Sequence, residues 1–506
     1  MEPFVIAKKT FANIRDISIR SGRFIRKYKN PLCLSILCVG TLWGIFQILL
    51  PGHVFNGDFA LYIRQALSIS AGDMKQVGED MQAMINGSTY NRYSPTLYPW
   101  GVPLLLSLIT SFSDIDYWLF KTEGIILFIG ALFLLYRNLT HQKGGMNNKV
   151  FFILSLTGGN VFYWHFCNSV TSEIFFLFFL QLSFFCMYSL YNTQRKTFST
   201  IHLFILGIIL YFTAQIRTEG YFVFLSLAAL QWKYRIKKKA LWMPYVGAIV
   251  SGVFFSLIFP NGYLEHIEHF KMLSWEQVVD NLFHFYNYPI RIFHFPLPWF
   301  NTFFWVCWTI GLYIGIHKYT AETVYMLSCI LLLMIWPYPE IRYWFALFPL
   351  CFLCFAEGIH LFFEQMKRTM IPFVEAAILL FLSIYIWGIS VSCIYPDKPS
   401  YSLSDPNVDG REAQEMFSYL RENTKITDWI ACGESRSIYL YTGRLCSNAY
   451  GDINQLDKRF DWYVVFRHRG NYLQYNPGIF RLHKKKFLQV FKNKDYIIYK
   501  IIKEQV

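Results

Sequence analysis

Long apolar blocks alternate with short polar stretches between residues 31 and 393. The blocks run for about 16 to 23 residues, which is close to the length an α-helix needs to cross the hydrocarbon core of a bilayer. The pattern predicts eleven membrane spans: 31–50, 116–137, 149–166, 169–191, 199–215, 218–232, 241–259, 298–316, 321–337, 342–362 and 371–393. We therefore expect an all-α polytopic membrane domain over residues 31–393.

Basic residues gather in alternate polar stretches. Eight Lys or Arg residues lie within the first 30 positions, against two acidic residues, Glu2 and Asp16. The loops 138–148, 192–198, 233–240, 317–320 and 363–370 are also basic. Loops with excess Lys and Arg stay in the cytoplasm. We expect the N-terminus 1–30 to be cytoplasmic and the protein to reside in the cell (inner or plasma) membrane. No small-residue cleavage site follows the first block, so we interpret it as a retained helix.

The loops on the opposite side are long, slightly acidic and poor in Lys. We place them at 51–115 and 260–297. The first includes the apolar stretch 98–113, which has only about ten residues after its last proline. Counting this stretch as a twelfth span would put every later basic loop outside. We therefore predict an interfacial helix at 98–113, with a true span as the alternative.

The composition becomes that of a soluble protein after the last apolar block. Residues 410–423 have helical periodicity, and 427–432, 461–466 and 495–502 have the composition of short strands. The pattern predicts a small α/β domain over residues 394–506. An odd number of spans places this domain on the extracytoplasmic side.

The overall composition agrees with a membrane protein. The chain has 506 residues, of which 54% are hydrophobic and 16% charged, whereas soluble proteins carry about 25% charged residues. A net charge of +14 could indicate nucleic acid binding, but the basic residues follow the cytoplasmic loops. We expect membrane lipid and no nucleic acid among the partners.

Eleven cysteines are scattered along the chain. Nine of them fall in or beside apolar blocks, where cysteine packs as a small hydrophobic residue. Cys351 and Cys354 form a CxxC pair without nearby residues to complete a zinc site. Cys432 and Cys446 lie in the C-terminal domain and could pair.

Ionisable residues gather at the predicted outer edge of the membrane. They are Asp58, Arg64, Arg92, Lys121, Glu123, Glu173, Arg217, Glu219, Glu340 and Arg342, with Tyr62, Tyr93 and Tyr98 among them. Such groups are costly in a membrane and are candidates for function. The structural alternatives are snorkelling of Arg and Lys at helix ends and, for Asp58, an N-cap on the following helix.

Four histidines lie in the outer loop 260–297: His266, His269, His284 and His294. The segment from Glu265 to His269 could bind zinc or orient an acceptor, but it lacks the HExxH pattern. We favour a solvated amphipathic helix that lies over any site formed at this membrane face, and we expect no metal.

The order of motifs resembles the bacterial GT-C glycosyltransferases, the superfamily of protein O-mannosyltransferases and lipid A aminoarabinose transferases. The resemblance is carried by Asp58-Phe-Ala-Leu-Tyr62 with Ala66 and Gly72, by Tyr93-Ser-Pro-Thr-Leu-Tyr-Pro-Trp-Gly101, by Thr171-Ser-Glu-Ile-Phe175 with Ile216-Arg-Thr-Glu-Gly220, by Ile341-Arg-Tyr-Trp-Phe-Ala-Leu-Phe-Pro-Leu350, and by Leu440-Tyr-Thr-Gly-Arg444. The family often has a second acidic residue where this chain has Phe59. That departure puts a metal-dependent reaction in doubt.

The resemblance implies transfer of a sugar from a polyprenyl-phosphate donor to an acceptor hydroxyl on a glycan, lipid or protein at the extracytoplasmic face. Asp58 would be the general base. Lys121, Arg217 and Arg342 would hold the lipid phosphate, with Arg64 and Arg92 behind them. Tyr62, Tyr98, Glu173 and Glu219 would complete the substrate site, and no cofactor is implied.

Two other functions remain open. A transporter or flippase of lipid-linked glycans would place charges midway through spans and often show internal repeats. The chain has edge charges and no visible repeat, which favours the enzyme. The third possibility is a membrane scaffold whose C-terminal domain binds glycan.

Overall fold

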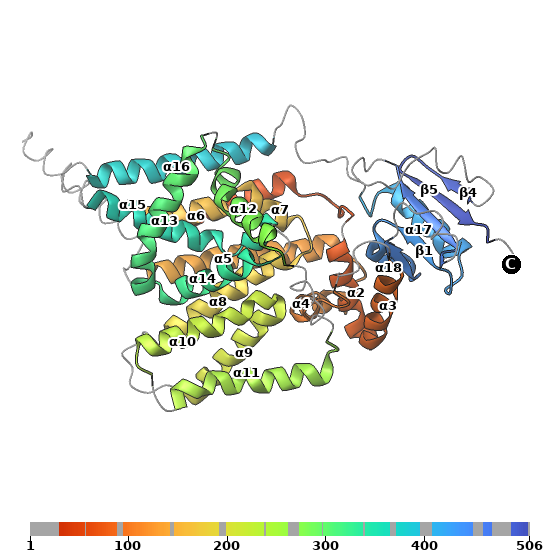
Figure 1. The fold of residues 1–506 in the computed structure, drawn as a ribbon, viewed down its shortest axis with the longest axis horizontal. Helices are drawn as coiled ribbons and strands as arrows, with labels where there is room; N and C mark the ends of the chain where they lie inside the picture. Colours follow the sequence, from red (N-terminus) through yellow and green to blue (C-terminus); the bar gives the residue numbers. More distant parts are fainter. Residues whose placement is uncertain are drawn as a thin grey trace, which may run out of the picture.

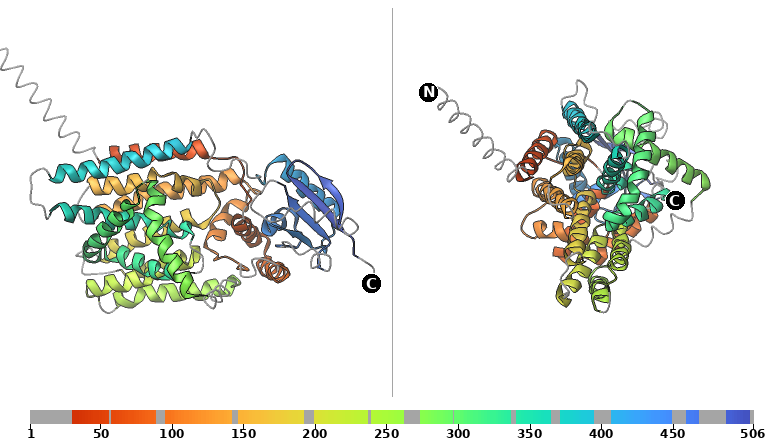
Figure 2. Two further views of the ribbon diagram at one scale, coloured as in Figure 1. Left: turned by 45° about the horizontal axis from the view of Figure 1, so that its top comes forward. Right: turned by 90° about the vertical axis from the view of Figure 1, so that its left-hand side faces the viewer.

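A bundle of long helices lies side by side, and a small sheet domain sits at one end of it (Figure 1). The computed structural model describes residues 30–55, 57–88, 95–141, 146–191, 199–236, 239–261, 273–295, 297–336, 340–364, 371–394, 407–448, 459–467 and 487–503. The helices α2 (Gly57–Ala71), α3 (Met74–Gly87) and α4 (Gly101–Thr110) lie between the bundle and the sheet domain (Figures 1 and 2).

Every predicted span contains helix. The helices are Asn30–Ile48, α5 (Tyr117–Thr140), α6 (Asn148–Gly158) with α7 (Val161–Cys167), α8 (Ser172–Tyr191), α9 (Thr200–Ile216), α10 (Val223–Lys233), α11 (Lys239–Ile258), α13 (Trp299–Lys318), α14 (Thr320–Met334), α15 (Phe348–Glu364) and α16 (Ile371–Ile394). Within the described residues, six helices are long and apolar enough to cross a membrane, or seven if α6 and α7 form one bent span. The total of eleven spans stays a prediction.

Polar side chains define where several membrane helices begin. Asp116 accepts hydrogen bonds from the backbone N–H groups of Trp118 and Leu119 at the start of α5. Asn160 does the same for Phe162 at the start of α7, directly after the 50° bend from α6. These N-caps satisfy donors that would otherwise be left without partners at a helix end.

Glycines allow α13 and α15 to pack closely. A Cβ atom added at Gly311 would lie 1.8 Å from the carbonyl oxygen of Cys354, and one at Gly358 would lie 1.7 Å from that of Cys307. Small residues permit such backbone contact between membrane helices, where dispersion and not water exclusion drives association. The pairing fixes the position of α15, which follows the short helix η3 (Ile341–Trp344).

The predicted outer loops contain the helices α2, α3, α4 and α12 in their described parts. The stretch 98–113 contains α4, whose ten residues are fewer than the roughly 20 that a spanning helix needs. The loop 260–297 contains α12 (Trp275–Phe293), which Ser274 caps by accepting from the backbone N–H of Gln277. His266 and His269 lie outside the described residues. No group of three or more metal-ligating side chains gathers among the residues that are described.

The C-terminal domain is built on a five-stranded sheet with the order β2-β1-β3-β5-β4. The strands are β1 (Ile430–Cys432), β2 (Cys446–Asn448), β3 (Trp462–Phe466), β4 (Phe487–Lys492) and β5 (Tyr496–Ile501). β1 runs parallel to β2 and β3, whereas β5 is antiparallel to β3 and β4. The predicted helix and three predicted strands coincide with α17 (Arg411–Asn423), β1, β3 and β5. The sequence did not indicate β2, β4 or α18 (Ser435–Thr442).

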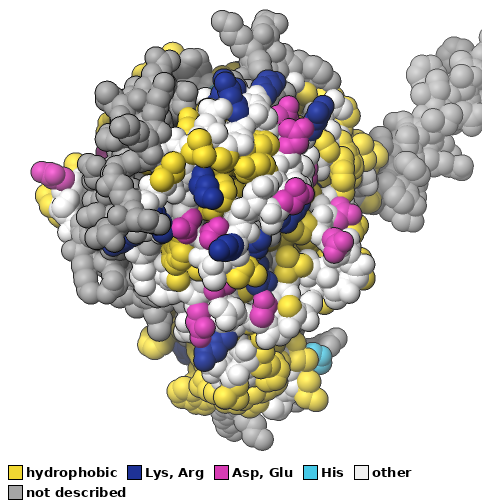
Figure 3. Space-filling model, turned by 90° about the vertical axis from the view of Figure 1, so that its right-hand side faces the viewer, with side chains coloured by type: hydrophobic (Ala, Val, Ile, Leu, Met, Phe, Trp, Pro, Cys, Tyr) yellow, Lys and Arg dark blue, Asp and Glu magenta, His cyan; other side chains and the backbone are white. Residues whose placement is uncertain are grey.

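The sheet domain docks on α2 and α3. Ser447 donates its hydroxyl to the carbonyl oxygen of Met84 at 2.8 Å, and the backbone N–H of Asn448 donates to Ser88 at 3.0 Å. Viewed from this end of the molecule, basic and acidic side chains are interspersed among uncharged ones (Figure 3). Such a mixed surface is typical of contact with water.

Candidate active site

Asp58 binds two side chains from distant parts of the chain. It lies in the first turn of α2, where the helix dipole favours negative charge. Its Oδ2 atom accepts from Nη1 of Arg342 at 2.5 Å, and its Oδ1 atom accepts from the Tyr98 hydroxyl at 2.6 Å. The Asp58 side chain keeps 22% of its surface exposed. The carboxylate is therefore held in place while it remains accessible.

These neighbours keep Asp58 ionised. Burial alone would raise the pKa of this carboxyl, but the charge of Arg342, the hydrogen bond from Tyr98 and the charge of Arg436 together outweigh it. The pKa of Asp58 is lowered below its ordinary value as a result. At neutral pH the group is a carboxylate, the form in which it can accept a proton.

Tyr98 is clamped against α2. The side-chain amide of Gln65 donates to the carbonyl oxygen of Tyr98 at 3.0 Å and accepts from its N–H at 2.9 Å. The ring of Tyr62 stacks on that of Tyr98 with 4.6 Å between the centroids. Burial, followed by the charge of Asp58, raises the pKa of both phenols, so both stay neutral. The site thus has two fixed hydroxyl groups beside one carboxylate.

Arg217 forms a second charged group. Its Nη1 atom lies 3.0 Å from Oε1 of Glu173, and its Nη2 atom lies 2.9 Å from Oε1 of Glu219. All three side chains are at least 85% buried. Arg217 also donates to the Ser172 hydroxyl at 3.2 Å. Arg217 lies between α9 and the short helix η1 (Thr218–Phe222), Glu219 lies in the first turn of η1, and Glu173 lies at the start of α8.

One cavity connects the two charged groups. It is lined by Glu173, Phe176, Arg217, Glu219, Tyr325, Cys329, Leu333, Arg342, Tyr343, Phe345, Ala346 and Leu347. The Oε2 atom of Glu173 is buried without a hydrogen-bond partner in the described part of the chain. The cavity therefore combines two guanidinium groups, two carboxylates and an apolar wall.

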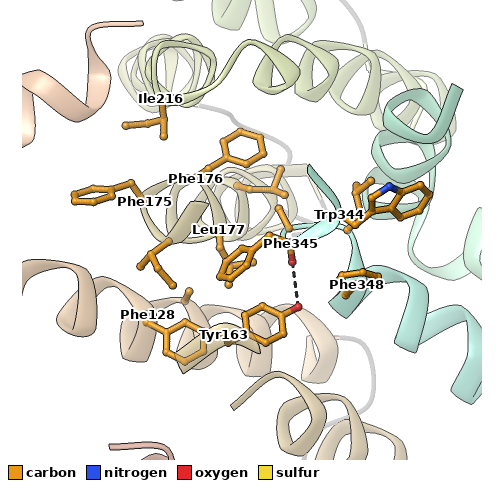
Figure 4. Close-up of a cluster of buried hydrophobic side chains, with 14 of the residues drawn as sticks. Phe128, Tyr163, Phe175, Phe176, Leu177, Ile216, Trp344, Phe345 and Phe348 are labelled. Atoms are coloured by element: carbon orange, nitrogen blue, oxygen red, sulfur yellow. Dashed lines mark hydrogen bonds between the residues drawn. The ribbon is translucent and has the colours of Figure 1, made fainter. Parts of the chain in front are cut away.

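An aromatic cluster supports the segment that follows Arg342. The Tyr163 hydroxyl donates to the carbonyl oxygen of Phe345 at 3.0 Å, and their rings lie 4.5 Å apart between centroids (Figure 4). Phe176 and Leu177 of α8 lie in the same cluster (Figure 4). Buried packing of this kind limits movement of η3 and of the guanidinium it carries.

Two predicted binding residues of the described chain, Lys121 and Arg64, do not join this group. Lys121 donates to the carbonyl oxygens of Leu50 and Gly52 at 2.7 and 2.5 Å, and to Asn168 at 2.9 Å. Arg64 pairs with Asp73 at 2.6 Å on the side of α2 that faces α18. Arg92 lies outside the described residues.

Sequence reasoning missed two residues that contact Tyr98. One is Gln65, which occurs seven positions after Asp58 and so lies on the same face of α2. The other is Arg436 of α18, whose Nη1 atom donates to the Tyr98 hydroxyl at 3.1 Å. Helical spacing could have indicated Gln65. No local signal could have indicated Arg436, because 338 residues separate it from Tyr98.

No family model and no curated protein matches the chain, but solved structures do. ArnT from Cupriavidus metallidurans bound to undecaprenyl phosphate aligns with a TM-score of 0.53 and 9% identity, covering 92% of this chain and 97% of that one. The oligosaccharyltransferase from Archaeoglobus fulgidus, tethered with an acceptor peptide, aligns with a TM-score of 0.52 and 11% identity, covering 88% and 70%. Both have the GT-C fold. This chain has the GT-C fold. Arg217 and Arg342 of its GT-C bundle lie near Asp58 of α2, at the end of the bundle next to the sheet domain.

Proposed function

We propose that this GT-C protein is a glycosyltransferase that moves a sugar from a polyprenyl-phosphate donor to an acceptor hydroxyl at the extracytoplasmic face. The observation that carries the proposal is the ionised Asp58 between Tyr98 and Arg342, beside a cavity that Arg342 shares with Arg217. A base and an anion-binding pair at one membrane edge are what such a transfer requires. ArnT, which shares the fold, binds undecaprenyl phosphate.

The reaction is a substitution at the anomeric carbon of the donor sugar. The acceptor oxygen forms a bond to that carbon while the bond from the carbon to the phosphate oxygen breaks. The phosphate leaves with the electron pair, and the acceptor proton passes to Asp58. Tyr62 and Tyr98 provide neutral hydroxyl groups that can orient the acceptor or the sugar.

Arg342 and Arg217 would hold the leaving phosphate. A guanidinium can bind two phosphate oxygens at once, and both of these side chains line the same cavity. Binding of the phosphate would draw Arg342 away from Asp58. Because Arg342 lowers the pKa of Asp58, that exchange raises its pKa and makes the carboxylate a stronger base when donor is present.

The lipid tail would lie against apolar surface next to this cavity. A second, apolar cavity is lined by Tyr288, Pro289, Ile292, Phe293, Phe304, Trp305, Trp344, Phe348, Cys351 and Phe352. Trp344 lies two positions after Arg342, so a donor phosphate held by Arg342 would have its isoprenoid chain close to this apolar wall.

A transporter of lipid-linked glycans is less well supported. Transport through the bundle would use charged groups at mid-membrane. The remaining buried ion pairs of the described residues lie at the opposite end of the helices, where Glu357 contacts Lys149 and Lys318, each at 2.6 Å. We interpret that cluster as a structural tie between α6, α13 and α15.

The test is complementation with Asp58→Asn in cells that lack the chain, with lipid extracts analysed by mass spectrometry. We expect the polyprenyl-phosphate sugar to accumulate both in the deletion and in cells with Asp58→Asn, with normal amounts of the variant protein in the membrane. Full consumption of the donor by Asp58→Asn would remove the base assignment. If deletion of the gene for this protein changes the amount of no lipid-linked sugar, the proposed function is wrong.

A further inference from the structure

Arg436 brings a charge from the sheet domain into the candidate active site. It is the second residue of α18, which packs on α2. Its Nη1 atom donates to the Tyr98 hydroxyl at 3.1 Å, and its Nη2 atom donates to the carbonyl oxygen of Pro95 at 2.6 Å. The guanidinium carbon lies 5.4 Å from the centroid of the Tyr98 ring. Arg436 therefore binds Tyr98 from the sheet domain, with its side chain next to Gly57 at the start of α2.

The hydrogen bonds around the Tyr98 oxygen have one consistent direction. A phenol oxygen carries one proton and can also accept. Arg436 has only donors, so the Tyr98 oxygen must accept from it. The single phenol proton is then directed to Asp58, 2.6 Å away. A donor whose oxygen accepts from a cation is a stronger donor in turn.

We propose that Arg436 is a positioning residue that holds the Tyr98 hydroxyl on Asp58, so that the sheet domain completes the catalytic site of the membrane domain. This inference rests on the proposed role of Asp58 as the base. It gives the appended domain a part in catalysis beyond covering one end of the bundle.

The docking contacts fix where Arg436 lies. Tyr439, one turn of α18 further on, donates to Asp80 of α3. The Tyr441 and Tyr117 hydroxyls are 2.6 Å apart, which ties α18 to the start of α5. The backbone N–H of Val408 donates to the carbonyl oxygen of His53 at 2.8 Å, close to where α2 begins. Two of these contacts hold α18 after Arg436, and the third holds the segment before α17 next to α2, so the guanidinium is in place before substrate binds.

The effect of Arg436 on the pKa of Asp58 follows from the titratable and charged groups around Asp58. These groups are Arg342 with its partner Glu340, Tyr98, Tyr62, Arg436 and, beyond Arg342, Glu173 with Arg217. Removing Arg436 takes away one positive neighbour and weakens the hydrogen bond that Tyr98 donates to Asp58, because the phenol oxygen no longer accepts from a cation. Both changes raise the pKa of Asp58. A lysine in place of Arg436 would restore the positive charge but could not donate to Tyr98 and Pro95 in the geometry of the guanidinium.

The experiment is a pH titration of the Asp58 carboxyl by infrared difference spectroscopy on the purified full-length protein, with Asp58→Asn used to assign the band. We expect Arg436→Gln to move the titration midpoint to higher pH by about one unit, with Arg436→Lys in between. The matched control is Arg411→Gln in the same domain, because Arg411 is exposed and pairs only at the surface with Glu415. That variant should titrate like the wild type.

A purely structural role for Arg436 predicts a different result. It would lower the thermal midpoint of Arg436→Gln and leave the Asp58 titration unchanged, and that outcome overturns the inference. If Arg436→Gln does not fold, Arg436→Lys and Tyr98→Phe supply the same comparison. The double variant Arg436→Gln/Tyr98→Phe should shift the midpoint by less than the sum of the two single shifts. Additive shifts would contradict action through Tyr98.

Undecaprenyl phosphate separates this inference from the proposed function. Its binding to the purified protein, followed by native mass spectrometry, should persist in Arg436→Gln, because Arg342 and Arg217 remain. If the wild type binds no undecaprenyl phosphate while the titration shifts as expected, the proposed function fails and the coupling of Arg436 to Asp58 stands. If the lipid binds and the titration does not shift, the inference alone fails.

Discussion

Arg342 pairs with Asp58 at 2.5 Å although 284 residues separate them in the chain. The contact joins η3 to the first turn of α2 and places the strongest local positive charge on the candidate base. It also makes Asp58 a weak base until something else binds Arg342. An anionic donor phosphate is such a group, so the ion pair offers a physical reason for the base to become effective only with donor in place.

Replacing Asp58 by Asn should abolish most transfer activity without preventing insertion. Asparagine keeps a hydrogen-bond acceptor for Tyr98 but cannot take up a proton from an acceptor hydroxyl. We expect turnover to fall by about 10²- to 10⁴-fold. The measurement is release of polyprenyl phosphate from a polyprenyl-phosphate sugar in isolated membranes. Asp114→Asn is the matched control, because Asp114 is exposed in the turn before α5. Equal loss in both variants would contradict a specific role for Asp58.

Replacing Arg342 by Gln should weaken donor binding and change the pH profile. Loss of a charge-assisted contact costs about 1.5–3 kcal/mol, which corresponds to a roughly 10- to 150-fold rise in the Kd for undecaprenyl phosphate. Asp58 also loses the charge that lowers its pKa, so the acid limb of kcat/KM should move to higher pH. In Arg342→Lys the acid limb should stay close to its wild-type pH, because the charge is kept. The affinity for undecaprenyl phosphate should fall in part, because lysine cannot bind two phosphate oxygens as a guanidinium does.

The control for this binding measurement is Arg291→Gln on α12. Arg291 is exposed and does not line the cavity of Arg217 and Arg342. The Arg291→Gln variant should bind undecaprenyl phosphate with the affinity of the wild type. If Arg342→Gln shows unchanged affinity together with an unshifted acid limb, the phosphate role of Arg342 is wrong.

The sequence located the helices better than it located the partners of the site residues. Apolar block length is a local property, and helix lies in every block from residue 31 to residue 393. The helix α12 was not delimited, because its apolar residues are interrupted by Asp280, His284 and Arg291. A half-buried helix lacks the continuous hydrophobic run that marks a span.

The predicted position of a charged residue at the membrane edge was not enough to predict which charged side chains contact one another. Asp58, Tyr98 and Arg342 are joined directly, whereas Arg64 is turned towards Asp73. A residue count along a loop does not specify the direction of a side chain. Arg436 was absent from the sequence argument because its contact depends on how the sheet domain docks, which is a tertiary property.

Replacing Lys121 by Met should lower stability and leave donor affinity unchanged. The Lys121 ammonium has three oxygen partners, on Leu50, Gly52 and Asn168, and the residue is 1% exposed. Methionine fills the volume but leaves buried acceptors without a donor, at a cost of about 1–3 kcal/mol. Thermal unfolding of the purified protein with and without undecaprenyl phosphate measures both quantities. If lipid affinity falls while stability does not, Lys121 has the phosphate-binding role predicted from the sequence.

Cys432 and Cys446 should form a disulfide in cells if the sheet domain faces an oxidising compartment. Their sulfur atoms are 3.7 Å apart, and both residues are fully buried on the neighbouring strands β1 and β2. A small side-chain movement would bring them to bonding distance, and an extracytoplasmic location favours oxidation. The bond would close a loop that contains α18 and stabilise the domain by about 3 kcal/mol.

The disulfide can be measured by alkylating membranes before and after reduction and then identifying the Cys432 and Cys446 peptides by mass spectrometry. We expect both thiols to be protected without reductant and labelled with it, in denaturing conditions that expose every cysteine. Cys354, which lies in α15, should be labelled in both samples. Thermal unfolding of Cys432→Ser should match that of the reduced wild type. Free thiols at both positions in cells with an oxidising periplasm would contradict the predicted disulfide.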